Sequence, residues 1–311
     1  MKNPPAPAEI HGLFVNIKPE KVWQQAEEII CRMSPSHDNR LARQAFDDVI
    51  RLFRGEYPGY CPIGTLYHDL HHTLDVFLCA VRLMHGVHIS GSRLTDDEIT
   101  MIMMSALMHD VGYAQREGEE SGTGAQYTQT HVNRSIEFMR QYLAEKNFPA
   151  SFSAPMELII LCSNPAINIP DIQFPDERTR LLGKILGTAD LTGQMADRCY
   201  LEKLLYLYLE FEEARIGNYQ TIHELLRNTQ VFYESTQQRL LEQFCGINVN
   251  LSLHFKDWFG VEKNFYQEAI EKKIAYINKV TSLDDGHHLP MLKRGGIVEQ
   301  AERRVGFVAR G

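Results

Sequence analysis

Apolar residues recur along most of the chain at the three-to-four-residue spacing of helices that bury one face. Between Leu70 and His85 they form one helical stripe, and Gly86 is expected to end that helix. No stretch of the sequence keeps the strict alternation of a half-buried strand. The pattern therefore predicts an all-α fold, a compact multi-helix bundle. Further helices are expected at about 19–33, 38–54, 99–109, 131–147, 155–163, 178–191, 195–214, 219–244 and 262–281.

One helix start is marked by its capping residues. Thr95-Asp96-Asp97-Glu98 has the capping-box pattern, in which the Thr hydroxyl and the Glu carboxylate each accept a backbone N–H. The apolar helix that follows is expected to run to about His109, with Gly112 as a stop. Residues 114–130 then form the longest irregular stretch, typical of a solvated loop or of a loop bordering an active site.

Ionisable residues interrupt the apolar pattern at three predicted helix ends. They are His68, His71 and His72 at the start of one helix, His109-Asp110 at the end of a second, and Asp190 at the end of a third. Ionisable groups placed where a core helix should continue need a partner. A divalent cation such as zinc, manganese or iron suits a mixed set of imidazoles and carboxylates. His68 and His72 are four residues apart, so both can face a common centre.

Composition narrows the possible partners. The 311 residues carry a net charge of −8, which argues against a nucleic-acid polymer or an anionic membrane as partner. A local anion site remains compatible with this charge, because a bound divalent metal attracts phosphate. The six cysteines are scattered, which favours free thiols in a reducing compartment. Apolar stretches are too short to span a bilayer and residues 1–12 lack a signal-peptide pattern, so we expect a cytoplasmic protein.

The chain shows no shift in composition before about residue 282. We therefore expect N-terminal helices over 1–60 that pack on the core, a catalytic domain over 61–281 and a C-terminal extension over 282–311. The extension is rich in Gly, Lys and Arg, and is interpreted as loosely ordered, with an oligomer arm as the alternative. A homo-oligomer is therefore left open. His287-His288 within it is read as part of a flexible tail.

Three segments resemble known motifs. Residues 67–76 read Tyr-His-Asp-Leu-His-His-Thr-Leu-Asp-Val and resemble the Tyr-His-Asn-x-x-His-Ala-x-Asp-Val signature of class I cyclic-nucleotide phosphodiesterases. Residues 106–112 and 188–191 resemble the His-Asp and Ala-Asp-Leu segments of that family. Their order and spacing resemble those of the broader HD superfamily, whose members bind metal on an all-helical fold. The resemblance covers roughly residues 60–245.

Position by position, the resemblance implies one divalent metal (Zn, Mn, Mg or Fe) with four ligands: His72, His109, Asp110 and Asp190. It also implies that Asp110 reaches towards a second metal and that a metal-held hydroxide attacks phosphorus. His68 would be the general acid for the leaving alkoxide, a task suited to an imidazole with an ordinary pKa of ~6.5.

Departures from the family pattern leave the second metal open. Tyr113 stands where the phosphodiesterases have the last histidine of His-Asp-x-x-His, which helps to organise their second-metal side. His131, in the next predicted helix, is a further candidate ligand; the alternative is a surface histidine near a helix start. Asp69 and Thr73 also replace the family's Asn and Ala.

Tyr67, Arg198 and Gln230 are the candidate substrate-binding residues. Tyr67 opens the signature, and Gln230-Val231-Phe232 approximates the family's nucleotide-holding glutamine with its following Val-x-Phe. The competing interpretation is an ordinary amphipathic helix with Phe232 in the core. Arg198 and Lys203 follow Asp190; solvated helix faces are the simpler interpretation for both, and more so for Lys203.

Three functions fit these residues. The first is metal-dependent hydrolysis of a phosphodiester or phosphate ester, a 3′,5′-cyclic nucleotide being one candidate, in a small molecule rather than a polymer. The second is an HD-type di-iron oxygenase, and the third a non-catalytic HD domain that senses a nucleotide. His68 favours the first, since an oxygenase has no evident use for a leaving-group acid. The intact ligand set argues against the third.

Overall fold

A computed structural model describes residues 13, 18–119, 121–217 and 219–305. Over these residues the chain is all α-helical and forms no strand, as the apolar pattern predicts. The α-helices are α2 (Pro19–Met33), α3 (Arg40–Phe53), α4 (Leu70–Ile89), α5 (Asp96–Met108), α6 (His131–Glu145), α7 (Ser153–Leu161), α8 (Glu177–Ala196), α9 (Tyr200–Ala214), α10 (Ile222–Glu242), α11 (Leu251–Phe259), α12 (Phe265–Thr281), α13 (His288–Met291) and α14 (Ile297–Val305). Short 3-10 helices are η1 (Val111–Tyr113), η2 (Ala125–Tyr127), η3 (Ala150–Phe152), η4 (Ile169–Asp171), η5 (Ile247–Asn250), η6 (Asp285–His287) and η7 (Arg294–Gly296).

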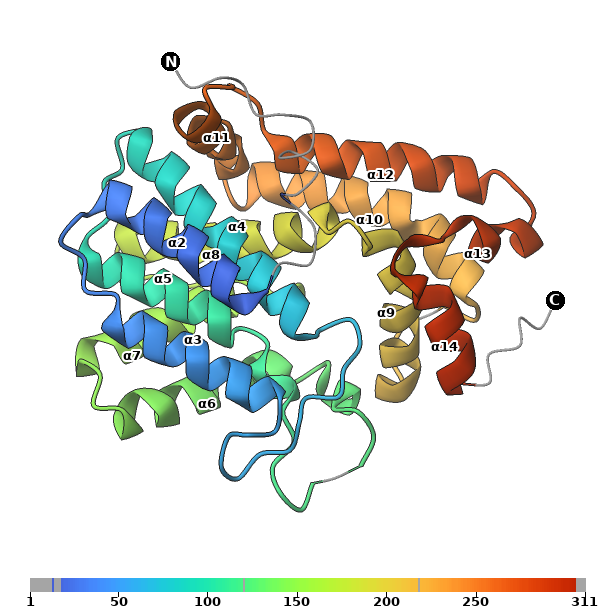
Figure 1. Ribbon diagram of the computed structural model, residues 1–311, viewed down its shortest axis with the longest axis horizontal. Helices are drawn as coiled ribbons and strands as arrows, with labels where there is room; N and C mark the ends of the chain where they lie inside the picture. Colours follow the sequence, from blue (N-terminus) through green and yellow to red (C-terminus); the bar gives the residue numbers. More distant parts are fainter. Residues whose placement is uncertain (1–12, 14–17, 120, 218, 306–311) are drawn as a thin grey trace.

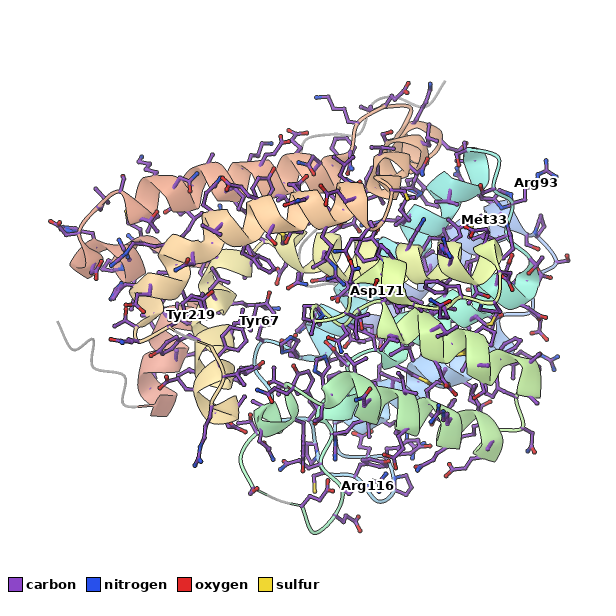
Figure 2. All side chains as sticks on the ribbon, turned by 180° about the vertical axis from the view of Figure 1, so that it is seen from behind. Met33, Tyr67, Arg93, Arg116, Asp171 and Tyr219 are labelled. Carbon is purple, nitrogen blue, oxygen red and sulfur yellow. The ribbon has the colours of Figure 1, made fainter. Side chains whose placement is uncertain are left out.

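Helices α4 and α8 pack along each other through the centre of the molecule (Figure 1). Fifteen of the twenty residues of α4 are buried, so this helix is apolar on nearly every side, as expected of a core helix. Side chains fill the space between helices: Tyr67 lies inside, whereas Arg93 and Arg116 lie at the outer edge (Figure 2). Polar groups carried by α4 and α8 are thus shielded from water and need partners inside the protein.

Gly86 does not end α4, which continues to Ile89. A Cβ at this position would lie 1.9 Å from the carbonyl oxygen of Asn250 in η5. Gly86 therefore permits a close approach of two backbones rather than a helix stop. By contrast, the capping box predicted at Thr95 is present, with both reciprocal hydrogen bonds.

Asp190 lies inside α8, not at a helix end as predicted, because α8 continues to Ala196. The two helices expected at 178–191 and 195–214 meet instead at the turn between α8 and α9. Asp190 is buried, and its side chain faces other polar groups described below. An inward-facing carboxylate with partners leaves the helical backbone intact, so it gave a misleading signal for a helix end.

Residues 282–305 are not a loosely ordered extension. They form η6, α13, η7 and α14, and Leu289, Leu292 and Ile297 belong to the same hydrophobic core as the central helices. Helix α14 packs on α9. The apolar residues of this segment are few and separated by Gly, Lys and Arg, so their helical spacing could not be recognised in the sequence. The rest of the predicted extension, 306–311, and residues 1–12, where no signal peptide was predicted, lie outside the described residues.

The N-terminal helices share this core. Helix α2 packs on α4, and α3 packs on α5. Among the described helices, none combines the length and apolar character needed to cross a membrane.

Candidate metal centre

The first turn of α4 presents His72. Asp69 is the N-cap of this helix, and its carboxylate accepts the backbone N–H of His72 at 2.8 Å. From α9, the Lys203 ammonium lies 3.7 Å from Asp69 and 2.9 Å from Asp197. Lys203 is buried, so the expectation of a solvated helix face is wrong for this residue. Its positive charge instead lies beside the carboxylate of Asp69, the residue that caps the start of α4.

The end of α5 presents His109 and Asp110. The chain leaves the helix after Met108, and both following side chains are buried. His109 Nδ1 donates to the carbonyl oxygen of Ala106 at 2.9 Å. A ring nitrogen that donates to a carbonyl fixes the tautomer, so the lone pair is on Nε2 and available to a metal.

Gly112 brings the next helix against this turn. A Cβ there would lie 1.9 Å from the carbonyl oxygen of His131, and its N–H donates to Ser135 Oγ at 2.8 Å. His131 Nδ1 donates to the carbonyl oxygen of Thr128 at 2.6 Å, which again leaves the lone pair on Nε2. That Nε2 lies 3.5 Å from Oδ1 of Asp110.

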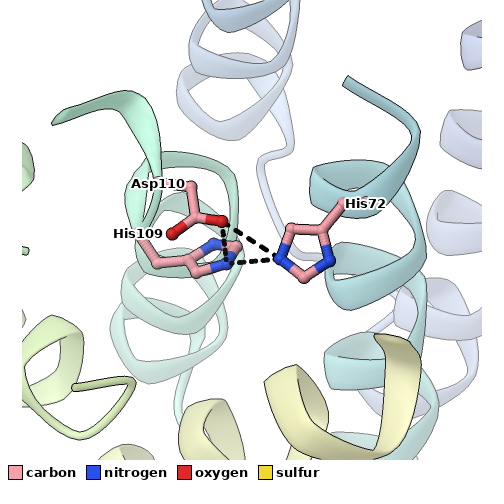
Figure 3. Close-up of side chains that lie close together, drawn as sticks. All are labelled: His72, His109 and Asp110. Carbon is pink, nitrogen blue, oxygen red and sulfur yellow. Dashed lines mark hydrogen bonds and ion pairs between the residues drawn. The ribbon is translucent and has the colours of Figure 1, made fainter. Parts of the chain in front are cut away.

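Three donor atoms meet at the centre of this arrangement (Figure 3). His72 Nε2 and His109 Nε2 lie 3.0 Å and 3.2 Å from Asp110 Oδ2, and 3.3 Å from each other. Two donors held about 2.1 Å from one ion stand about 3.0 Å apart at a right angle and about 3.4 Å apart at the tetrahedral angle. The three separations are therefore those of ligands around a common cation.

The donor set also fits a metal by its chemistry. Asp110 Oδ2 is buried and has no hydrogen bond of acceptable geometry among the described residues, although two ring nitrogens lie beside it. A buried carboxylate oxygen without a donor is costly, and a cation removes that cost. The buried group of His72, His109 and Asp110 can therefore hold a metal ion.

Asp190 comes to the same point from α8. Its Oδ1 lies 3.6 Å from His72 Nε2 and 3.7 Å from His109 Nε2. The structure thus brings together all four residues to which the family resemblance gives a ligand role, from three helices.

The side chains of the centre differ in their exposure to solvent. The side chains of His72, His109 and Asp110 are 1–5% exposed, whereas those of Asp190 and His131 are 12% and 13% exposed. His68, at 17%, is the most exposed of the six. Within this group, His68, His131 and Asp190 are therefore the side chains that solvent reaches most.

His68 is held by Glu210 of α9, a residue that the sequence interpretation missed. His68 Nδ1 donates to Glu210 Oε2 at 2.6 Å, and the backbone N–H of Tyr67 donates to Glu210 Oε1 at 2.6 Å. Burial lowers the pKa of His68, but the charge and hydrogen bond of Glu210, together with the charges of Asp110 and Asp190, more than offset it, so the pKa is raised. The signal was present: Glu210 is an acidic residue after the apolar run 204–209, the same kind of break that singled out His109 and Asp190.

Tyr113 packs against both His68 and His131. Its ring stacks on His68 at a centroid distance of 4.7 Å and on His131 at 4.6 Å, with interplanar angles of 20° and 13°. The side chain is fully buried. His68 and His131 also approach each other, with ring centroids 6.2 Å apart, so the three rings form one aromatic group at the position where the phosphodiesterase pattern has a third histidine.

The histidines and carboxylates of the centre shift each other's pKa values. Burial lowers the pKa of His109, but the carboxylates of Asp110 and Asp190 raise it to about 9. Burial raises the pKa of Asp110, yet the neighbouring histidines hold it well below its usual range. Ring nitrogens must lose such protons before they bind a cation, so metal binding here releases protons.

Two of the candidate substrate-binding residues lie elsewhere. Arg198 has an exposed side chain in the turn after α8. The amide of Gln230 donates to Glu234 and accepts from Asn278 of α12, so it is committed to helix packing. Phe232 is 43% exposed, which makes the alternative of a buried Phe232 wrong as well.

Tyr67 does lie at the centre, where its side chain contacts other protein residues that hold the site together. Its side chain is buried and its hydroxyl donates to Gln194 Oε1 at 2.8 Å, which ties the start of α4 to the end of α8. The ring packs at 5.0 Å from the ring of His68.

A family model described as Npun_R2479-like matches residues 116–247, which is less than half of the chain. The matched segment contains His131, Asp190 and Glu210, whereas His72, His109 and Asp110 precede it. No curated protein matches the chain.

Proposed function

We propose that this protein is a metal-dependent phosphohydrolase of the HD superfamily that cleaves a small phosphodiester or phosphate ester. The observation that carries the proposal is the pair formed by His68 and Glu210 beside the group of metal-binding donors. A metal site alone would fit many functions. An imidazole beside that site, with a carboxylate that favours its protonated form, fits a reaction with an oxygen leaving group.

The metal would be held by His72, His109, Asp110 and Asp190. Two imidazoles and two carboxylates favour zinc, manganese or ferrous iron over magnesium, which prefers oxygen ligands throughout. Such a cation, when bound, supplies an activated water as nucleophile and neutralises charge on the phosphoryl oxygens.

His68 would protonate the leaving oxygen. Because Glu210 engages Nδ1, only Nε2 can face an ester oxygen. The raised pKa favours the protonated ring, in which Nε2 also carries a proton. As the P–O bond breaks, the Nε2 proton passes to the leaving alkoxide and the ring becomes neutral. Glu210 fixes the tautomer and stabilises the charged form before transfer, as a positioning residue.

A second cation has a smaller set of donors. Asp110 presents Oδ2 to His72 and His109, and Oδ1 to His131 Nε2 at 3.5 Å. A second ion, if bound, would be held by Asp110 and His131. Tyr113 offers no nitrogen there, so this ion would be held more weakly than the first.

The proposal is tested by turnover after metal reconstitution. Stripped protein receives zinc, manganese, magnesium or ferrous iron and is assayed on 3′,5′-cyclic nucleotides, alkyl and aryl phosphodiesters and monoesters. We expect turnover of at least one ester. His68→Ala should keep its metal and lose activity mainly on alkyl esters, because an aryl leaving group needs little protonation. His71→Ala, from the same turn, is the matched control and should behave as the wild type.

Other outcomes would replace the proposal. A protein that binds metal but turns over no ester with any cation would be a nucleotide-sensing domain. Two irons per chain with oxygen consumption would identify an oxygenase, an arrangement for which His131 beside Asp110 is the favourable observation. If His68→Ala loses equal activity on alkyl and aryl esters, the assignment of the general acid is wrong.

A further inference from the structure

A second group of nitrogen and oxygen donors lies outside the candidate metal centre, where α10 begins beside α13 (Figure 1). His223 is in the first turn of α10, Asp285 is in η6, and His288 is the first residue of α13. One donor atom from each lies within 4.8 Å of the others. The sequence interpretation placed His288 in a flexible tail, whereas the structure buries it completely.

A hydrogen bond indicates which tautomer His288 adopts. Its Nε2 donates to the carbonyl oxygen of Leu283 at 3.0 Å, so the lone pair is on Nδ1. This Nδ1 lies 3.2 Å from Nδ1 of His223. Two nitrogens bound about 2.0–2.1 Å from a tetrahedral zinc ion stand about 3.3–3.4 Å apart. The separation of the two histidines is close to that value.

Asp285 is oriented by an arginine. Arg227, one turn after His223 on α10, donates to Asp285 Oδ1 at 2.6 Å and to Oδ2 at 3.2 Å. Each carboxylate oxygen has two acceptor positions, so this ion pair leaves one on each oxygen. An outer partner that fixes the direction of a ligand is the usual support of a metal site.

We propose that His223, Asp285 and His288 form a second divalent-cation site, structural in role, that fastens the turn before α13 to α10. Two imidazoles and one carboxylate, with a water as fourth ligand, suit zinc. The turn precedes Leu289 and Leu292, which enter the core, and α14, which packs on α9. A cation here would therefore stabilise the whole C-terminal segment, and its binding free energy would add to folding.

The test compares two conservative variants of full-length protein. His223→Gln keeps a polar side chain beside His288 but removes a good zinc ligand. His287→Gln changes the exposed neighbouring histidine, which lies outside the donor group, and is the matched control. Each protein is stripped, given zinc, passed through gel filtration and analysed for bound zinc and for its thermal midpoint.

We expect His223→Gln to retain one zinc per chain fewer than the wild type, with His287→Gln unchanged. Zinc should also raise the midpoint by a few degrees more in wild type and His287→Gln than in His223→Gln. Equal zinc content in the two variants would overturn the proposal. Because the comparison is a difference between variants, it holds whether or not the centre at His72 binds zinc or catalyses a reaction.

Discussion

Replacing Glu210 by Gln should move the pH dependence of activity without removing the metal. The carboxylate accepts from His68 Nδ1, whereas the amide nitrogen of Gln donates and so favours the neutral ring. The pKa of His68, now raised by Glu210, should fall because burial, which lowers it, is then opposed by fewer charges.

The size of the effect follows from the charges. Two unit charges about 4 Å apart in surroundings of effective dielectric constant about 20 attract by about 4 kcal/mol. His68 is 17% exposed, and solvent screening should reduce the loss to about 2 kcal/mol, which is about thirty-fold in the ratio of protonated to neutral ring. For an alkyl ester, the loss in kcat/KM should begin near the new pKa and reach about that factor above the wild-type pKa of His68, and at low pH kcat/KM should approach wild type.

The assay is a pH profile of kcat/KM together with an NMR titration of the His68 ring, which requires no turnover. Glu213→Gln is the matched control, since this carboxylate is also on α9 but accepts from Thr123 rather than from His68. A uniform loss of activity at every pH, or an unchanged His68 titration, would refute the assigned role of Glu210. Loss of bound metal would show that the substitution disturbs the ligands instead.

Three further outcomes are expected. His72→Ala and Asp190→Ala should lose bound metal and activity together, measured by metal content and turnover; either variant with full metal would remove that residue from the ligand set. Burial lowers the pKa of His85 to about 4, so the unfolded state takes up this proton first as the pH falls. The free energy of unfolding, measured with urea, should therefore be about 2 kcal/mol lower at pH 5 than above about pH 6.5, and this difference should be absent in His85→Gln. Gly112→Ala places a Cβ against the His131 carbonyl and should lower stability by about 1–3 kcal/mol; unchanged stability would mean that α6 shifts freely.

The fold class and the meeting of distant polar residues could be predicted from the sequence, because both follow from local patterns. Apolar periodicity gave the helices, and polar interruptions of that periodicity gave His72, His109 and Asp190. The same patterns misplaced boundaries. Gly86 and Asp190 were both predicted to end a helix, yet each lies inside one. Gly86 allows a neighbouring backbone to approach α4, and Asp190 faces polar partners across the core.

Roles that depend on one distant partner could not be predicted in the same way. Lys203 resembled a solvated lysine until the structure placed the carboxylates of Asp69 and Asp197 beside it. Gln230 matched a family motif in order but faces Asn278. In both cases the side chain type was compatible with several environments, and only packing between helices selected one.

The separation of the central residues along the chain bears on how the protein matures. His68 and Glu210 are 142 positions apart, and His72 and Asp190 come from helices that are separated by α5, α6 and α7. Closing such long loops costs entropy that only the packed core repays, so no short stretch of nascent chain can assemble the donors. On the proposed function, metal would therefore be acquired late, after α8 has docked on α4, and His68 would gain its partner Glu210 later still, once α9 has been synthesised and folded against them.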